Sequence, residues 1–538
     1  MFKVAVRCNR AALQKGGLFF LETHILPPTG TTAPMLTISL YGGSTFSYHC
    51  PMKQLFCFLL LLFCVGMVQA QEPDRPAVMH SPEALRADLL LLREQLEAIH
   101  TGLYAYTDKA AMDRSFDSLY ASIEEPMSSI AFYRMLSVLH ARVKNGHTAL
   151  LPAASYDAAL QKALPRLPLS VYWHEGKLYV TEDNATEQTI TEGSQILQIN
   201  GEDAGQVMDL LVSRWTRDGN NRSKPERDVC DNFAFFYAYF IGTPAVYEVE
   251  VLSPAGTKST QRIAALPKPD ILQNQQVRYG SDSTKTAEKA LSFAIKGDTA
   301  LMTIRDFSTA YYKQTGQDYE AFFADAFTRL ASKNTRHLIL DLRDNTGGNA
   351  APVATLLSYL VKEPFTCYKA ILSKSKTVPK PRHYQNKIAF WNLSSWTWMR
   401  KTADGYRYTR GEYGLKPTQP SAPTYGGKVY VLINANSFSA TGELASLLQD
   451  KGIGTFIGEE AGGNASQNTS GYTPVLVFPN TRLRMLIPTQ RFILDVHRPN
   501  DGHGVRPDHE VKPGIEDLLQ GRDVVMDFTL DLISKSED

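Results

Sequence analysis

Two stretches of this chain carry residues suited to acyl-transfer chemistry. The first is Asp341-Leu342-Arg343-Asp344-Asn345-Thr346-Gly347-Gly348, and the second is Asn436-Ser437-Phe438-Ser439-Ala440. Each follows an apolar, strand-like run and precedes a helix-like segment. Backbone N–H groups at the start of a helix have no intrahelical acceptor, so a glycine-rich turn and a serine at such positions can together stabilise a developing negative charge. The two stretches predict serine hydrolase chemistry.

The elements around these stretches alternate between strand and helix patterns from residue 288 to 515. The expected strands are 299–304, 337–342, 428–433 and 454–458, and the expected helices lie near 318–333, 350–361 and 440–450. This succession predicts an α/β catalytic core built on a mostly parallel or mixed sheet, in β/α/β order.

An insertion at 362–426 interrupts this core. It is rich in proline and contains Trp391, Trp396 and Trp398 together with several basic residues. Long insertions of this kind are often lids, so we expect an excursion over the active face. Aromatic and basic residues together are also found where nucleic acid binds, but the chain has no net basicity, which favours buried aromatic packing.

Two further regions precede the core. Ser81-Pro82-Glu83 is typical of a helix start, and apolar residues then recur every three or four positions, which predicts an N-terminal helical cap domain over 80–150. Short alternating runs predict a β-rich domain over 165–270. Within it, Gly193 to Gly201 resembles the glycine-bounded strand of a PDZ-like module, and an ordinary β-hairpin in a small mixed domain is the alternative.

Composition limits the class of partner. The chain has 538 residues, 43% hydrophobic and 21% charged, with 56 Lys and Arg against 55 Asp and Glu. A net charge of +1 gives no overall field that would attract nucleic acid or an anionic membrane. A peptide or protein substrate is therefore the expected partner, and nucleic acid is not. The residues do not indicate an oligomeric state.

The N-terminal region contains a stretch typical of exported proteins, preceded by about fifty further residues. Residues 52–70 have a positive start, a short apolar run and a small-residue cleavage site before Gln71, which predicts a signal peptide. We interpret 1–51 as a non-native extension. The apolar run is too short to span a bilayer comfortably, so no integral membrane segment is expected after its removal, and the location is periplasmic or extracellular. Cys230 and Cys367 then remain, and we expect two separate buried thiols.

Several motifs together resemble the C-terminal processing peptidase and tricorn-core family of serine peptidases, family S41. The resemblance is carried by the stretch 341–348, by 429–440 and by Ile457-Gly458-Glu459-Glu460-Ala461-Gly462-Gly463, and it spans about residues 80 to 515. It implies a crotonase/ClpP-like sheet in the α/β core, with a helical cap and a PDZ-like domain before it.

By this resemblance the nucleophile is Ser439. A serine hydroxyl needs a base within hydrogen-bond reach and donors for the oxyanion. The backbone N–H groups of Ala440 and of Gly347 or Gly348 are the expected donors. The alternative is that Ser437 or Ser439 only caps the following helix.

The base is expected to be a histidine. One branch of the family uses a lysine after the serine, but this chain has no lysine between Lys451 and Lys512. The tricorn-like branch takes a histidine from the N-terminal cap, and Asn145-Gly146-His147-Thr148 is similar to its motif. A histidine can accept the serine proton and return it to the leaving amine.

The acid that orients this histidine is less sharply defined. Residues 500–508 resemble the closing motif of the same branch, which implies Asp501 as the acid. Glu459 and Glu460 are competing acids, and His503 within the closing motif is a rival base.

Neither a metal nor a cofactor is implied. His497, His503 and His509 recur every six residues, which matches neither one helical face nor the usual zinc spacings. We therefore expect a secreted serine endopeptidase that uses Ser439, His147 and Asp501. The alternatives are a catalytically silent peptide- or ligand-binding protein on the same scaffold and an esterase with the same triad.

Overall fold

The computed structural model describes residues 78–280, 289–385, 393, 396–411 and 413–535, and the backbone of a hairpin between β1 (Thr37–Leu40) and β2 (Ser44–Ser47). The predicted signal peptide 52–70, and 1–51 apart from this hairpin, lie outside the described residues. Met1–Arg75 and Pro76–Asp538 are separate units, and all the elements from β3 onward belong to the second.

A six-stranded mixed sheet forms the centre of the C-terminal half. Its strands, in spatial order, are β12 (Leu291–Lys296), β13 (Thr299–Ile304), β14 (His337–Asp341), β18 (Lys428–Ile433), β19 (Thr455–Gly458) and β24 (His509–Glu510). Only β12 runs antiparallel to its neighbour. The central strands are almost continuously apolar because both faces of the sheet are covered. The predicted mixed α/β architecture is confirmed.

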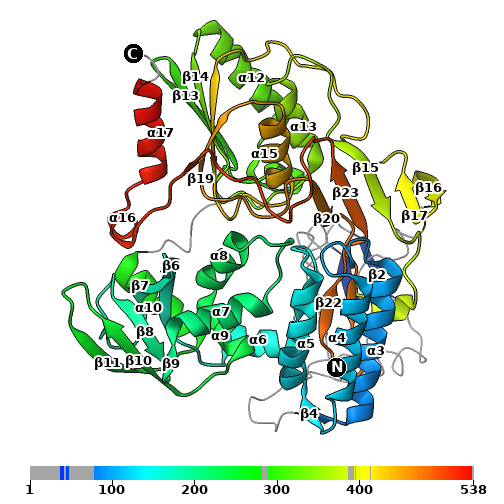
Figure 1. Ribbon diagram of the computed structural model, residues 1–538, viewed down its shortest axis with the longest axis vertical. Helices are drawn as coiled ribbons and strands as arrows, with labels where there is room; N and C mark the ends of the chain where they lie inside the picture. The colour runs from blue at the N-terminus through cyan, green and yellow to red at the C-terminus, as the bar shows by residue number, and fades with distance from the viewer. Residues whose placement is uncertain are drawn as a thin grey trace. The chain divides into compact units, whose positions relative to one another are not determined.

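Helices cover both faces of this sheet (Figure 1). Helices α12 (Tyr319–Ser332), α13 (Ala350–Ser358) and α15 (Ala440–Asp450) pack against one another beside one face. On the other face, α17 (Val524–Lys535) contacts β18 and β19, and its Val525 and Ile533 pack on Ile339 and Leu432. Two shorter helices, α11 (Thr309–Thr315) and α16 (Ile515–Leu519), lie in the connections.

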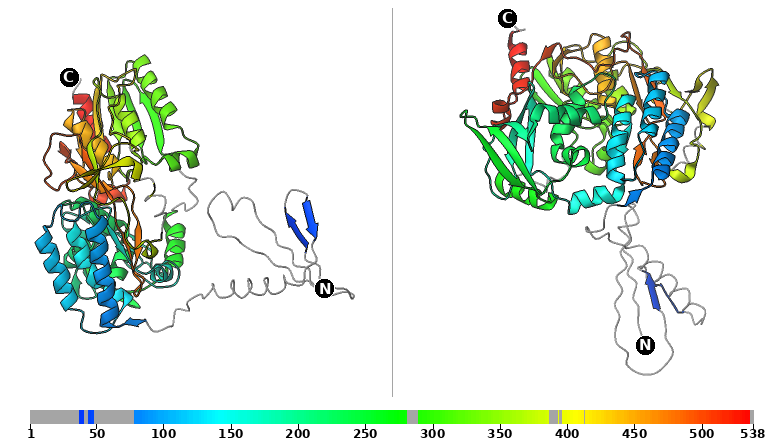
Figure 2. Two further views of the ribbon diagram at one scale, coloured as in Figure 1. Left: turned by 90° about the vertical axis from the view of Figure 1, so that its right-hand side faces the viewer. Right: turned by 60° about the horizontal axis from the view of Figure 1, so that its bottom comes forward.

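Three helices near the start of the unit lie side by side, as Figures 1 and 2 show. They are α3 (Pro82–Ile99), α4 (Lys109–Ala121) and α5 (Ser129–Val143). The side chains of Ser81, Asp108 and Ser128 accept a hydrogen bond from the first turn of these helices. Each helix therefore begins where a capping residue stands in the sequence, as predicted for Ser81. A small pairing of β3 (Met79–His80) with β4 (Met127–Ser128) lies beside them.

An antiparallel sheet follows in the middle of the chain. Its strands run in the order β11 (Lys258–Ala264), β10 (Val246–Leu252), β8 (Gln195–Ile199), β7 (Lys177–Asp183) and β6 (Leu169–His174), with β9 (Glu202–Asp203) paired to β8. The accompanying helices are α6 (Ala154–Lys162), α7 (Ala204–Arg214), α8 (Ser223–Asp231), α9 (Phe233–Phe240) and α10 (Lys268–Tyr279). Strands β6 and β7 form an antiparallel hairpin, in which His174 pairs with Lys177. The PDZ-like identity and the domain boundaries stay predictions.

The insertion 362–426 contributes strands to a further sheet. The spatial order is β16 (Met399–Thr402), β17 (Gly405–Tyr408), β15 (Tyr368–Ser373), β23 (Gln490–Leu494) and β20 (Gln467–Ser470). A short 3-10 helix covers Pro381–His383. Trp398 is partly buried against the core, but Trp396 is 66% exposed, so the expected aromatic burial is wrong for Trp396. Trp391 lies outside the described residues.

Strand β5 (Ala149–Leu151) connects the helical part with the core. It pairs with β22 (Arg484–Leu486), which in turn pairs with β21 (Val475–Val477). A second link is the buried carboxylate of Asp88 in α3, which accepts hydrogen bonds from the backbone N–H and side chain of Thr481 at 2.8 and 2.7 Å. A buried carboxylate needs such donors. These contacts hold the turn before β5 against the core.

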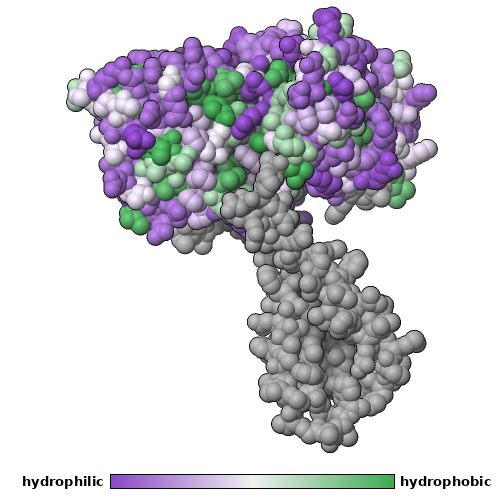
Figure 3. Space-filling view, turned by 90° about the horizontal axis from the view of Figure 1, so that it is seen from below, coloured by the Kyte–Doolittle hydropathy of each residue, from purple (hydrophilic) through white to green (hydrophobic). Residues whose placement is uncertain are grey.

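Cys230 and Cys367 are free and buried, as predicted. None of the described helices combines the length and the apolar character that crossing a membrane requires. The face in Figure 3 is mostly hydrophilic with small apolar patches among the described residues, a distribution common on protein surfaces.

Candidate active site

The two chemistry-bearing stretches meet because they follow neighbouring parallel strands. β14 and β18 pair in parallel, so the turns after them lie at the same edge of the sheet. Ser437 Oγ donates to Leu342 O at 2.9 Å, and Phe438 N donates to Asn345 O at 3.1 Å. These bonds fix the turn before α15 against the glycine-rich turn.

Ser439 has an uncommon backbone conformation, with φ 55° and ψ −125°. A positive φ is unfavourable for a residue with a Cβ, and such strain is concentrated at functional positions. Ser439 precedes the first residue of α15, but its side chain makes no capping hydrogen bond. The capping interpretation therefore lacks the interaction that would support it.

His147 is the hydrogen-bonding partner of Ser439. Its Nε2 lies 3.0 Å from Ser439 Oγ, and its ring stacks on Phe438 with centroids 4.7 Å apart. The turn that carries His147 ends directly before β5, which is held by its pairing with β22. A Cβ on Gly146 would lie 2.8 Å from both Asp218 Oδ2 and the Phe438 ring, so glycine is required at this close approach.

Burial, together with the smaller effect of the positive charge of Lys224, lowers the pKa of His147 to about 4. Lys224 Nζ lies 5.6 Å from the Phe438 ring centroid, on which His147 also stacks. The Nδ1 atom of His147 is buried and has no hydrogen-bond partner among the described residues. His147 is thus neutral at pH 7, with its second nitrogen available to a further group.

Backbone amides lie next to Ser439. The Gly347 N–H donates to Asn345 Oδ1 at 2.9 Å, whereas the N–H groups of Gly348 and Ala440 donate to no acceptor in the part of the chain that the structure describes. A Cβ on Gly347 would lie 2.7 Å from Ser439 Cβ and 2.9 Å from Ala440 N, so only glycine permits this approach. Two of the three expected donors, Gly348 and Ala440, are free to bind an oxyanion.

The predicted acids are engaged elsewhere. Asp501 is exposed, and its Oδ1 accepts the backbone N–H of His503 at 2.9 Å. Glu459 forms an ion pair with Lys512 at 3.3 Å. Glu460 Oε1 accepts the Gly504 N–H at 2.9 Å and lies 3.2 Å from His503 Nδ1. No hydrogen bond joins any of these three carboxylates, or His503, to the His147–Ser439 pair within the described residues.

A different carboxylate, Asp218, adjoins the turn that carries His147. Asp218 Oδ1 accepts the Gly146 N–H at 2.9 Å and Asn145 Nδ2 at 3.1 Å. Burial raises the pKa of Asp218 to about 6, while these two donors act in the opposite direction. Sequence reasoning missed this residue because Asp218-Gly219 has the form of a simple turn, and only the fold brings it to residues 145–147.

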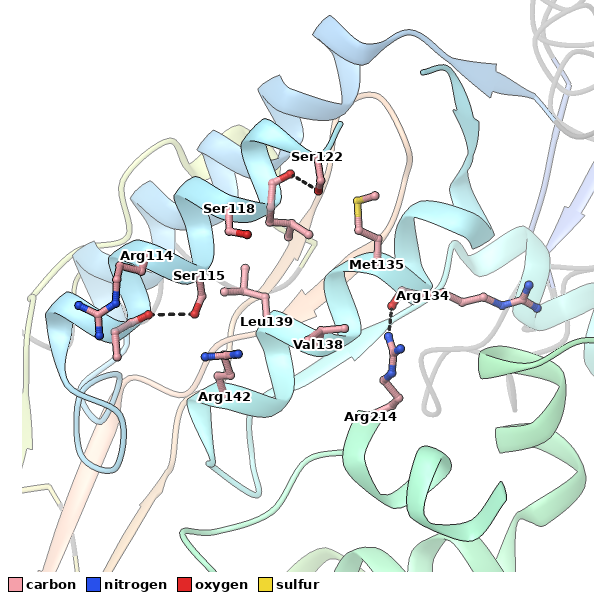
Figure 4. Close-up of a pocket in the computed structure, with 12 residues that line it drawn as sticks. Arg114, Ser115, Ser118, Ser122, Arg134, Met135, Val138, Leu139, Arg142 and Arg214 are labelled. Atoms are coloured by element: carbon pink, nitrogen blue, oxygen red, sulfur yellow. Dashed lines mark hydrogen bonds between the residues drawn. The ribbon is translucent and has the colours of Figure 1, made fainter. Parts of the chain in front are cut away.

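A cleft of about 590 Å³ opens beside the pair and includes His147, Ser439 and Ala440 in its lining. A cavity of about 630 Å³ lies between α4 and α5 (Figure 4), and several of its polar side chains bond to nearby carbonyls. There Ser115 and Ser122 donate to carbonyls of their own helix, and Arg214 donates to Arg134 O. It lacks a nucleophile and base in contact, so the smaller cleft is the candidate active site.

The three histidines of the C-terminal region diverge in the structure. His497 Nδ1 lies 3.1 Å from Asp450, His503 is beside Glu460, and the ring of His509 lies against Phe528 with centroids 5.2 Å apart. In the ranges that the structure describes, no group of three or more His, Cys, Asp or Glu side chains has an arrangement that could hold a metal ion.

Comparisons with known proteins bear on the family and the fold. Residues 298–511 match the model of peptidase family S41. The solved structure of mature CPAF is 14% identical over 81% of this chain and 94% of its own, with a TM-score of 0.56. The structure of mature CPAF complexed with lactacystin is 15% identical, covers 85% of this chain and 99% of its own chain, and has a TM-score of 0.60. A putative peptidase from Parabacteroides merdae is 16% identical over 84% and 96%, with a TM-score of 0.42. The comparison with curated proteins gave no match.

The pH dependence of Ser439 reactivity should reflect the lowered pKa of His147. The hydroxyl needs neutral His147, so covalent labelling by a phosphonate should proceed above the pKa of about 4 and be lost as the pH falls through it. In Lys224→Gln the positive charge that lowers this pKa is gone, so the acid limb should move to higher pH. Labelling rates from about pH 3 to 8, with circular dichroism to verify folding, give the acidic limb of the rate–pH profile for wild type and for Lys224→Gln.

The matched control is Lys451→Gln, an exposed lysine just beyond α15. It should leave the limb in place. A wild-type limb near the ordinary histidine value of about 6.5, or an unmoved limb in Lys224→Gln, would contradict the assignment of a low pKa to His147.

Proposed function

Because residues 298–511 belong to peptidase family S41 and the chain is a serine-type peptidase, we propose that it cleaves peptide bonds with Ser439 as nucleophile and His147 as general base. The observation that carries this proposal is the 3.0 Å contact between His147 Nε2 and the hydroxyl of the strained Ser439. A nucleophile and a base in hydrogen-bond contact are the minimum for acyl transfer by serine.

The reaction begins when Ser439 Oγ attacks the carbonyl carbon of the scissile bond and His147 Nε2 accepts its proton. The carbonyl oxygen becomes an oxyanion, which accepts hydrogen bonds from the N–H groups of Gly348 and Ala440. His147 then gives the proton to the leaving amine, and the C–N bond breaks. A water molecule, deprotonated by His147, releases the acyl group from Ser439 and restores the hydroxyl.

A carboxylate should assist His147. The shift of the His147 pKa from 6.5 to about 4 means that burial destabilises the protonated ring by about 3 kcal/mol. Since the ring must carry the serine proton during the reaction, a negative charge near it lowers this cost. We propose Asp218 for this role, supported by its hydrogen bond to Gly146, the residue before His147. Asp501, the acid implied by the family resemblance, is the competing assignment.

Export is part of the proposal. The signal-like residues 52–70 support a periplasmic or extracellular peptidase acting on peptides or proteins. An esterase would use the same acyl-transfer groups, so matched peptide and ester substrates are needed to separate the two activities.

Labelling of the mature protein with a serine-directed phosphonate tests the nucleophile and the base. Wild type should be labelled at Ser439, Ser439→Ala should lose the label, and His147→Ala should slow labelling by about a hundredfold or more because the general base is gone. Mass spectrometry of the labelled peptide measures the site.

Ser470→Ala is the matched control, because this second serine also lines the cleft. It should label at the wild-type rate. An unlabelled wild type, or a label that survives Ser439→Ala, would overturn the assignment.

Replacement of Asp218 or Asp501 by asparagine tests which carboxylate assists His147. Asp218→Asn keeps an oxygen that can accept the Gly146 N–H but removes the charge, so kcat should fall by about a hundredfold with KM little changed. Its pH profile should also shift, which a purely structural role would not produce. Asp501→Asn should stay within about threefold of wild type.

The reverse pattern would assign the acid to Asp501. If both variants kept wild-type kcat and pH profile, neither carboxylate would assist His147. Peptide hydrolysis measured from pH 4 to 9 distinguishes these outcomes.

A further inference from the structure

Among the described residues that line the cleft beside Ser439, Glu443 is the one acidic side chain. It lies one helical turn after Ser439 in α15, and its N–H donates to Ser439 O at 2.9 Å. Residues four positions apart lie on the same face of a helix, with Cβ atoms about 6 Å apart. Glu443 therefore enters the same cleft as the nucleophile.

The Glu443 carboxylate is held by neutral donors. Asn468 Nδ2 donates to Oε1 at 2.6 Å, and the Tyr368 hydroxyl donates to Oε2 at 2.5 Å. The residue is only 5% exposed. No described Lys, Arg or His forms an ion pair with it. A carboxylate offers about four acceptor positions, so capacity remains for a further donor.

The rest of the cleft provides no compensating charge. Apart from Glu443 and the neutral His147, the described residues that line it are uncharged. A buried carboxylate without a cation is costly, and burial accordingly raises the pKa of Glu443. A positively charged ligand group would remove much of that cost.

The walls of the cleft suit a long cationic side chain. Tyr368, Trp398, Tyr408 and Phe492 line it, and all come from β15, β17 and β23 or from the residue just before β16. Aromatic faces attract ammonium and guanidinium groups and also pack against aliphatic stems. The combination of aromatic walls and a single carboxylate favours lysine and arginine over acidic or small side chains.

We propose that Glu443 is the specificity-determining residue of this peptidase and that it selects peptides with a lysine or arginine adjacent to the scissile bond. This inference rests on the proposed function, since it names the substrate class of the same site. The cationic group would donate to the Glu443 carboxylate while the scissile carbonyl lies at Ser439.

Cleavage of a mixed peptide library, with mass spectrometry of the products, tests the selection. Cut bonds should be enriched in an adjacent lysine or arginine on one side. For the preferred sequence, a matched pair of peptides with lysine or acetyl-lysine at that position isolates the charge. We expect kcat/KM to be roughly tenfold or more higher for lysine in wild type, and the difference to be absent in Glu443→Gln.

Two further variants serve as controls for the role of the Glu443 charge. Glu443→Asp retains the charge and should retain a preference for lysine, whereas Glu320→Gln, which changes an exposed carboxylate of α12, should behave as wild type. Labelling by a small neutral phosphonate reports on Ser439 independently of the selected side chain. Glu443→Gln should still be labelled, which shows that it is folded.

Equal cleavage of the lysine and acetyl-lysine peptides by a wild type that labels normally would overturn the selection proposal and leave the proposed function intact. Absence of labelling in wild type would overturn the proposed function itself. An unchanged lysine preference in Glu443→Gln would assign the selection to another residue.

Discussion

The hydrogen bond between His147 and Ser439 joins residues that are 292 positions apart, and the site depends on the contacts that hold these two segments together. The strand β5 begins two residues after His147 and pairs with β22 of the core. The buried Asp88 adds a link between α3 and Thr481. Because neither segment carries both groups, the reactive pair exists only while the helical part is docked on the core.

Burial sets the electrostatics of the site. It lowers the pKa of His147, to about 4, and raises the pKa values of Asp218 and Glu443. Each of these two carboxylates is stabilised by neutral hydrogen-bond donors, and no lysine or arginine in the described ranges forms an ion pair with either. They lie in different places: Asp218 contacts the turn that carries His147, and Glu443 lines the cleft beside Ser439. Burial of a carboxylate thus underlies both the proposed assistance to His147 and the proposed choice of substrate.

Local sequence patterns predicted the central elements well. The expected strands at 299–304 and 428–433 and the expected helix at 440–450 coincide with β13, β18 and α15. Long apolar runs and glycine-bounded turns carry this information within a few neighbouring residues. The proximity of the two chemistry-bearing turns followed from the same patterns, since parallel neighbouring strands end at the same edge.

Long-range pairing could not be predicted in the same way. The sequence of the insertion 362–426 indicates an excursion, yet its β15 pairs with β23, more than a hundred residues later in the chain, and forms a wall of the cleft. Asp218 is likewise brought to residues 145–147 only by tertiary structure. Glu443 is different, because its spacing from Ser439 on a predicted helix would have placed it on the same face.

The central claim is that Ser439 reacts within a pocket made by His147 and the amides of Gly348 and Ala440. A crystal structure of the phosphonate adduct tests it most directly. We expect a phosphorus bond to Ser439 Oγ, with the phosphoryl oxygen about 2.7–3.1 Å from both amide nitrogens and His147 still beside Oγ. An adduct on another residue, or a phosphoryl oxygen turned away from both amides, would contradict it.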